Sequence, residues 1–357
     1  MNKHHPLCFL LLAAILLPAS CTTPRRDGTG RIVEDGTGRK VELPARIERI
    51  VGLRPGALRL LAYMETTDLV AGIEQVETTG ADRPYMVAHP ELLERPFIGP
   101  RGGDNERILH VRPDLIFLTY ASAGEADALA EKTGIPVVAL QYPEIGTDPQ
   151  QLYASLQIIG QVLHKEDRAD SLVAYIQQTI RDLDNRTRHI PADRKPSAYI
   201  GGIAHGRARN LTSTHPDYPP FVFTHAHNVA AGIDRSRISS LAGAYVDIEQ
   251  LLLWDPDVIF VDQAGLLLAQ QDLKLAGNLA AVKNRRIYTL PTYNSYAVNY
   301  ETALINSWYV GRILYPAAFA DIVPEEKADE ILEQFLGKRL PPRSLTPGSF
   351  QPLQLPE

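Results

Sequence analysis

Arginine and tyrosine recur in the segments that follow the strand-like apolar runs of this sequence. Arginine presents planar pairs of hydrogen-bond donors to carboxylate, phosphate or oxyanion groups, and tyrosine combines an apolar ring with one hydroxyl. Together they suit an anionic ligand, such as a ferric chelate, a haem propionate or a small tetrahedral oxyanion. The residues in these positions are Arg54, Arg101, Arg207, Arg209, Tyr120, Tyr142, Tyr293 and Tyr296.

Histidines are concentrated in one stretch, where His205, His215, His225 and His227 fall within 23 positions. His225 and His227 form a His-x-His sequence, and imidazole is the commonest ligand of transition metals. These two residues are therefore candidate metal ligands. No acidic residue stands beside them as a third ligand, so packing or surface histidines are the alternative.

Sequence signatures of common enzymes are absent from the chain. It contains no His-Glu-x-x-His, Gly-x-Ser-x-Gly or Gly-Lys-[Ser/Thr] motif. The His-x-His pair leaves a secreted metal-dependent hydrolase as a remote alternative. We expect a binding protein that is not an enzyme and has no cofactor of its own.

The composition is that of a globular protein with room for more than one domain. The chain has 357 residues, 45% of them hydrophobic and 22% charged, and a formal net charge of −6. A single core rarely grows beyond roughly 250–300 residues, so we expect two domains. The mildly acidic balance, without basic blocks, argues against nucleic-acid binding.

The N-terminus has the features of an export signal. Lys3 precedes an apolar run over Leu7–Leu17, and small residues lie just before Cys21. The run is shorter than the about 20 residues that span a bilayer, so residues 1–20 are predicted to be a cleaved signal peptide. Cys21 is then the only cysteine of the mature chain and cannot form an internal disulfide.

The two ends of the mature chain are predicted to be extended. The residues before Cys21 resemble a bacterial lipobox, except that Pro18 stands where leucine is usual. The resemblance implies a lipid anchor at Cys21 and a tether over residues 21–32, on the outer face of the cytoplasmic membrane or in the periplasm. Residues 338–357 contain five prolines and are predicted to form a poorly ordered tail.

Between these ends, strand-like runs alternate with helical stretches, which is the pattern of βα units around a parallel sheet. The predicted fold class is α/β, with two Rossmann-like lobes at 33–147 and 191–337 and a ligand cleft between them. A helical segment at 148–190 separates the lobes. The strand candidates are 47–53, 69–73, 96–98, 114–118, 136–140, 197–203, 257–262 and 286–290.

The helical segment between the lobes should be rigid. Apolar residues recur along it at three- and four-residue spacing, and the charged cluster at 165–168 predicts a break. The part after the break would have about 22 residues and a length of roughly 33 Å at 1.5 Å per residue. Such a helix predicts a stiff strut and little closure of the lobes on ligand binding.

One sequence pattern occurs once in each lobe. Glu106 stands seven positions before Pro113 and Glu249 seven positions before Pro256, and each proline is followed by aspartate and an apolar run. Proline and aspartate ahead of an apolar run indicate the end of a helix and the start of a strand. The repeat predicts that the two lobes are built alike.

These segments resemble the class III substrate-binding proteins of ABC importers for iron-siderophore complexes, haem and cobalamin. The resemblance rests on the Asp35–Pro44 segment, the two Glu…Pro-Asp repeats and the helical spine. The segments 206–221 and 299–319 resemble a subgroup that also includes molybdate and tungstate binders. The resemblance covers roughly residues 33–337.

The resemblance implies capture of an iron complex, a siderophore- or haem-type chelate, with a molybdate or tungstate oxyanion as the alternative cargo. It also implies delivery to an ABC permease dimer with a cytoplasmic ATPase, with Glu106 and Glu249 docking on permease arginines. His205, His215 and Tyr218 lie in stretches that resemble ligand-facing loops. We expect a monomer.

Overall fold

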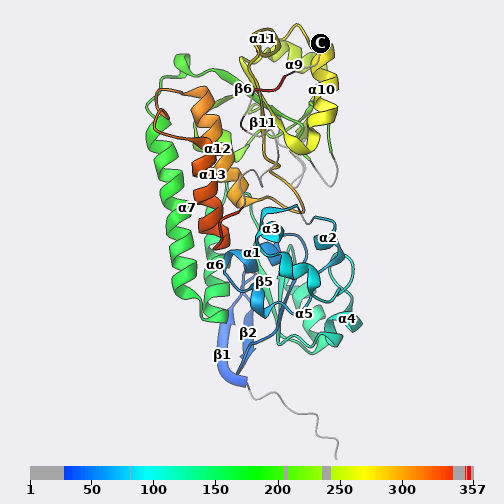
Figure 1. Cartoon of the computed structure of the whole chain (residues 1–357). Helices are drawn as coiled ribbons and strands as arrows, with labels where there is room; N and C mark the ends of the chain where they lie inside the picture. The colour runs from blue at the N-terminus through cyan, green and yellow to red at the C-terminus, as the bar shows by residue number, and fades with distance from the viewer. Residues whose placement is uncertain are drawn as a thin grey trace, which may run out of the picture.

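The computed structural model describes residues 28–80, 82–204, 208–234, 243–340, 350 and 352–354. The predicted signal peptide, Cys21, His205 and Arg207 lie outside these residues. The described chain forms two lobes that are stacked along the helix α7 (Glu166–Thr187) (Figure 1).

The N-terminal lobe contains a parallel sheet in the order β3-β4-β5. All residues of these strands are buried, as the continuous apolar runs predict for parallel strands covered on both faces. Val70, Ile73 and Phe97 add single parallel bridges, so the strands expected at 69–73 and 96–98 are bridges only. The bounds are β3 (Ile50–Leu53), α1 (Ala57–Tyr63), α2 (Gln75–Thr78), α3 (Pro84–Ala88), α4 (Asn105–His110), β4 (Leu115–Thr119), α5 (Ala123–Thr133) and β5 (Val137–Leu140).

The C-terminal lobe contains a second parallel sheet, in the order β11-β10-β6-β8. A short antiparallel pair, β7 with β9, lies beside it. The bounds are β6 (Ser197–Gly201), β7 (Ser213–Thr214), α8 (Pro219–Phe223), β8 (His227–Asn228), β9 (Ala244–Tyr245), α9 (Ile248–Trp254), β10 (Val258–Asp262), α10 (Leu266–Leu275), α11 (Ala280–Lys283) and β11 (Ile287–Leu290).

The repeated Pro-Asp sequences occupy equivalent places in the two lobes. The Asp114 carboxylate accepts a hydrogen bond from the backbone N–H of Arg49, at the start of β3, at 3.0 Å. The Asp257 carboxylate accepts one from the backbone N–H of Ser197, at the start of β6, at 2.8 Å. Each aspartate precedes one strand and caps the beginning of its neighbour, so the predicted likeness of the lobes is confirmed.

The predicted helical segment is a pair of helices, and only the second connects the lobes. The helix α6 (Pro149–Leu163) packs on the N-terminal lobe, and the chain turns at His164, whose φ is 56°. The following α7 has 22 residues and extends along both lobes (Figure 1). Its buried residues, among them Leu172, Ile176 and Leu183, form the expected apolar stripe.

The last two helices link the lobes a second time. The helix α12 (Tyr300–Leu314) is followed by α13 (Pro324–Leu336), which returns to the N-terminal lobe. There the Phe335 ring packs edge-on against Tyr63, with ring centroids 5.0 Å apart. The segment assigned by sequence to the C-terminal lobe thus ends on the other lobe, because the apolar face of α13 is buried against α1, α3 and α7.

The structure corrects the predictions for the tether and the tail at the residues of each that it describes. Residues 28–32 belong to β1 (Gly28–Glu34), which pairs with β2 (Lys40–Pro44), so a tether reaching residue 32 is wrong. The prediction of a poorly ordered tail is wrong for its described end, where the Leu353 N–H donates to the Ile287 carbonyl at 2.8 Å. Within the described chain, no helix has the length and apolarity needed to span a membrane.

Candidate functional site: the junction between the lobes

Residues after β3 and β4 form the N-terminal side of the junction. Arg54 and Tyr120 directly follow these strands and have φ values of 72° and 49°, a left-handed conformation that is costly for residues with a Cβ. The Arg54 guanidinium donates to the Tyr120 carbonyl at 2.7 Å and to Glu125 at 2.8 Å. Arg54, a predicted ligand contact, therefore holds two loops together in this structure.

Glu74 connects the loop after β3 and the loop before α4 with the other lobe. Its carboxylate accepts hydrogen bonds from the backbone N–H groups of Arg54 and Gly102 and from the Tyr296 hydroxyl, the last at 2.8 Å. Burial raises the pKa of Glu74. Because Tyr296 lies between β11 and α12, this hydrogen bond crosses from one lobe to the other.

The Tyr296 ring also faces arginines of the N-terminal lobe. The guanidinium of Arg83 lies 5.3 Å from the ring centroid and that of Arg101 lies 5.9 Å from it. Arg83 donates to the Ser295 hydroxyl at 3.0 Å and pairs with Glu77 at 2.8 Å. Arg101 is exposed and makes no ion pair among the described residues, so its charge is available to a ligand.

A buried arginine fixes the loop that carries Tyr296. Arg59, in α1, donates hydrogen bonds to the carbonyl oxygens of Ser295 and Val298, both at 2.8 Å. It also donates to the Tyr142 hydroxyl at 2.7 Å. The guanidinium thus replaces the water that would otherwise solvate these carbonyls, and it holds the loop against the N-terminal lobe.

Tyrosines close the junction beside this loop. The Tyr293 hydroxyl donates to Glu144, whose pKa is raised by burial, and the Tyr300 hydroxyl donates to the Pro143 carbonyl at 2.8 Å. Tyr300 stacks on Tyr142 with ring centroids 4.8 Å apart. These contacts form an aromatic wall that is shared by both lobes.

His215 lies behind Tyr293 in the C-terminal lobe. Its ring centroid is 6.2 Å from that of Tyr293, and its buried Nδ1 has no hydrogen-bond partner among the described residues. Burial lowers the pKa of His215 to about 4, so the imidazole is neutral at pH 7. A neutral ring with an unpartnered nitrogen can donate to or accept from a ligand, depending on its tautomer.

Two predicted contacts lie deeper than expected. Tyr218 is fully buried, and its hydroxyl accepts a hydrogen bond from Asn306 at 3.2 Å. The aromatic rings of Phe221 and Tyr293 pack against Tyr218, and a direct ligand contact by Tyr218 stays a prediction. Tyr293 is also buried. Tyr120, whose ring centroid lies 5.9 Å from that of Tyr142, is the exposed tyrosine next to this wall.

Asp262 is the buried acid at the end of β10. Its carboxylate accepts hydrogen bonds from the backbone N–H groups of Tyr293 and Ala264, at 2.8 and 2.9 Å. Burial raises the pKa of Asp262 to about 7. The side chain thereby connects the start of the segment after β10 with the segment after β11.

The two histidines of the His-x-His sequence lie away from the junction. His225 Nε2 is 2.8 Å from a carboxylate oxygen of Asp184 in α7, and His227 is an exposed residue of β8. No group of three His, Cys, Asp or Glu side chains that could hold a metal occurs in the part of the chain that the structure describes. Metal binding by this pair stays a prediction.

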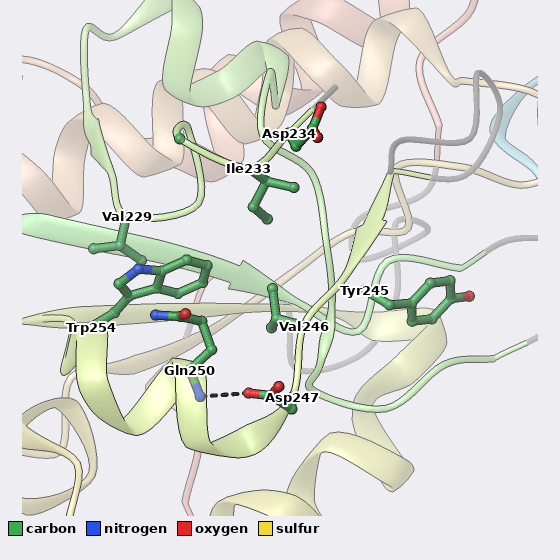
Figure 2. Close-up of a pocket in the computed structure, with 9 residues that line it drawn as sticks. Val229, Ile233, Asp234, Tyr245, Val246, Asp247, Gln250 and Trp254 are labelled. Carbon is green, nitrogen blue, oxygen red and sulfur yellow. Dashed lines mark hydrogen bonds between the residues drawn. The ribbon is translucent and has the colours of Figure 1, made fainter. Parts of the chain in front are cut away.

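Arg209 lies near a pocket in the C-terminal lobe. Its guanidinium is 5.6 Å from the ring centroid of Tyr245, which borders a pocket of about 330 Å³. Figure 2 shows Trp254 and Gln250 of α9 pointing toward this pocket. The pocket belongs to the C-terminal lobe, and the contact with Tyr245 places Arg209 beside it.

The two glutamates of the sequence repeat are both exposed, in the first turns of α4 and α9. The preceding helix caps are also equivalent, because Asp104 accepts a hydrogen bond from the backbone N–H of Arg107 and Asp247 from that of Gln250. Glu106 thus has the same position in its lobe as Glu249.

Sequence reasoning missed several residues of the junction. Arg59, Glu74, Arg83, Glu144 and Asp262 were not candidates, because none follows a motif that sets it apart from an ordinary surface charge. The usable signal was the location of Glu144 and Asp262 at or just beyond the ends of predicted strands.

Comparison with known proteins agrees with this architecture. Residues 50–293 match the family described as periplasmic binding protein. The molybdate-binding protein MolA of Haemophilus influenzae is 26% identical over 353 residues, which cover 91% of this chain and 95% of MolA. An uncharacterized ABC transporter substrate-binding lipoprotein of Bacillus subtilis, YvrC, is 24% identical over 204 residues, or 54% of this chain and 61% of YvrC.

Solved structures show the same fold. MolA bound to molybdate superposes with a TM-score of 0.69 at 23% identity, covering 87% of this chain and 99% of that one. The petrobactin-binding protein YclQ of Bacillus subtilis gives a TM-score of 0.58 at 18% identity, covering 85% and 98%.

Proposed function

Because this chain belongs to the periplasmic binding protein family, we propose that it captures a small metal oxyanion of the molybdate type at the junction between its lobes. The protein is an extracytoplasmic substrate-binding protein of an ABC transporter and not an enzyme. Its cargo is a transported ligand, a metal complex or a metal oxyanion, and no cofactor is involved.

The observation that carries the oxyanion proposal is the direct bridging of the two lobes. The hydrogen bond between Tyr296 and Glu74, at 2.8 Å, and that between Tyr293 and Glu144 cross the junction. The hydrogen bond from Arg59 to the Val298 carbonyl is a third contact between the lobes. Lobes that are held together at these places favour a small anion over a bulky chelate.

Three donors beside the junction residues have no ion pair or side-chain hydrogen bond within the described part of the chain. Arg101 offers a guanidinium without an ion pair, and the Tyr120 hydroxyl makes no hydrogen bond within the described residues. His215 offers its unpartnered Nδ1. Burial raises the pKa of Tyr120 to about 12, so this hydroxyl keeps its proton and donates at pH 7. The similarity to MolA over nearly its whole length supports the same class of cargo.

Calorimetric titration of the purified protein tests this proposal. Molybdate and tungstate should bind, while sulfate, a ferric siderophore and haemin should bind more weakly. Arg101→Ala should weaken molybdate binding by about tenfold to a hundredfold, the usual value of a hydrogen bond to a charged group. Arg46→Ala is the matched control, since Arg46 is 81% exposed before β3. Absence of molybdate binding by the wild type would overturn the proposal.

An iron complex is the second candidate cargo, a chelate of the siderophore or haem type. It is favoured by the exposed ring of Tyr120, on which a flat or aromatic chelate could pack and which lies against the buried rings of Tyr142 and Tyr300. The similarity to the petrobactin-binding protein YclQ points the same way. The same titration separates the two cargoes.

We further propose that Glu106 and Glu249 dock on an ABC permease dimer, which its cytoplasmic ATPase drives. Their equivalent, exposed positions at the first turns of α4 and α9 support this role. We also propose a monomer that is anchored by a lipid on Cys21. Mass spectrometry of the membrane-extracted protein and of Cys21→Ser would test the anchor.

A further inference from the structure

We infer that each permease-docking surface is a glutamate–leucine pair, Glu106 with Leu109 on the N-terminal lobe and Glu249 with Leu252 on the C-terminal lobe. The inference rests on the proposed docking role of the two glutamates. It adds the chemistry of the partner, which would present an apolar side chain beside a cation at both surfaces.

The two helices that carry these pairs are oriented alike. Each begins with an aspartate cap, and the residue two positions after the glutamate, Ile108 or Leu251, is completely buried. A cap and a buried anchor together fix how a short helix is rotated on its lobe. The residues that flank the anchors on α4 and α9 are therefore exposed in the same way.

On each helix a partly exposed leucine lies beside the glutamate. Leu109 is 44% exposed and Leu252 is 41% exposed, and each stands three residues after its glutamate. Residues three apart on a helix are neighbours on one face. One exposed leucine is ordinary on a protein surface. The same leucine next to the same acid, at matching positions of two lobes, is explained by a partner that covers both.

The opposite face of α9 shows that Leu252 does not serve the pocket in its own lobe. Asp247, Gln250 and Trp254 line that pocket (Figure 2). Leu252 lies two residues from both Gln250 and Trp254, which places it on the other side of the helix. Glu249 and Leu252 are therefore directed away from the pocket and toward a partner.

The two members of a pair should contribute differently to docking. The attraction of an exposed glutamate to a permease cation is screened by salt. The free energy gained when leucine surface is removed from water depends little on the salt concentration. If docking uses both the glutamates and the leucines, variants without the glutamates should keep a part of the binding affinity that does not depend on salt.

The test is binding of the full protein to its ABC permease complex in nanodiscs, at 50 and 500 mM salt. Leu109→Ala with Leu252→Ala should weaken docking by about tenfold at both salt concentrations. Leu267→Ala with Leu275→Ala is the matched control, because these α10 leucines are 78% and 87% exposed and lie beside no docking glutamate. The control should bind within about twofold of the wild type.

Glu106→Ala with Glu249→Ala separates this inference from the docking proposal. It should weaken docking mainly at low salt. Impaired glutamate variants together with normal leucine variants would overturn the inference and leave the docking proposal standing. Normal docking by the glutamate variants would overturn both.

Discussion

Arg59 of the N-terminal lobe donates a hydrogen bond to the backbone carbonyl of Val298 in the C-terminal lobe, at 2.8 Å. The guanidinium is completely buried and reaches the Ser295 carbonyl as well. One side chain thus satisfies two carbonyls of a loop whose Tyr296 and Ala297 have φ values of 53° and 86°. The loop is held in a costly conformation by contacts that come from the other lobe.

Replacement of this arginine should therefore destabilise the whole protein. In Arg59→Met the side-chain length is kept, but the Ser295 carbonyl loses the Arg59 donor and the Val298 carbonyl keeps only the hydrogen bond from the Tyr142 hydroxyl. We expect a loss of about 2–4 kcal/mol in the free energy of unfolding, measured by urea denaturation. Arg46→Met at an exposed site should change it by less than about 0.5 kcal/mol. Equal stability of the two variants would contradict the role of Arg59.

The double connection between the lobes should limit their motion. The helix α7 spans both lobes, and α13 binds back to the first. We expect closure by only a few degrees on cargo binding. Small-angle scattering with and without saturating molybdate should give the same radius of gyration within error, and a clear decrease would contradict this rigidity.

Asp262 should make stability depend on pH. Its pKa is raised to about 7 in the folded protein by burial, against about 3.9 in an unfolded chain. The folded state therefore holds a proton that the unfolded state loses, and the stabilising contribution disappears as the pH rises from about 4 to 7. The side chain of Asp262→Asn cannot ionise. The amount by which its free energy of unfolding is lower than that of the wild type should therefore shrink over this pH range.

Urea denaturation at pH 5 and pH 7.5 measures this difference. The exposed Asp193→Asn is the control and should show a constant difference from the wild type. A deficit of Asp262→Asn that grows with pH would mean that the Asp262 carboxylate is charged and stabilised by the N–H groups of Tyr293 and Ala264.

The docking proposal predicts a separation of transport from cargo binding. Glu106→Ala with Glu249→Ala should leave cargo affinity nearly unchanged, because both residues are exposed and neither is one of the junction residues described above. Uptake and stimulation of the transporter ATPase should fall sharply, and each single variant should have a smaller effect because one lobe stays anchored. Normal transport by the double variant, or loss of cargo binding, would contradict the assignment.

The lobes could be predicted from sequence because their signals are local. Each buried strand is an uninterrupted apolar run, and Asp114 and Asp257 each stand at the start of one. The apolar stripe of α7 is visible at helical spacing. These patterns involve residues that are close together in the sequence, so they can be recognised without the structure.

The junction could not be predicted in the same way because its contacts are distant in sequence. Arg59 is separated from Val298 by 239 residues and Glu74 from Tyr296 by 222. Nothing near Arg59 distinguishes it from a surface arginine in a helix. Tyr120 and Arg101 were identified because they follow strands, whereas Tyr218 was placed by resemblance and is buried.

The return of α13 to the N-terminal lobe has a consequence for how the protein is made. Phe335 completes the packing around Tyr63, and Lys338 donates to the Ala88 carbonyl at 3.0 Å. The N-terminal lobe therefore acquires this part of its core only after the segment through Lys338 has been synthesised. A nascent chain whose first lobe waits for α13 stays incompletely folded for longer, which is the state in which a chain can be threaded through a membrane pore.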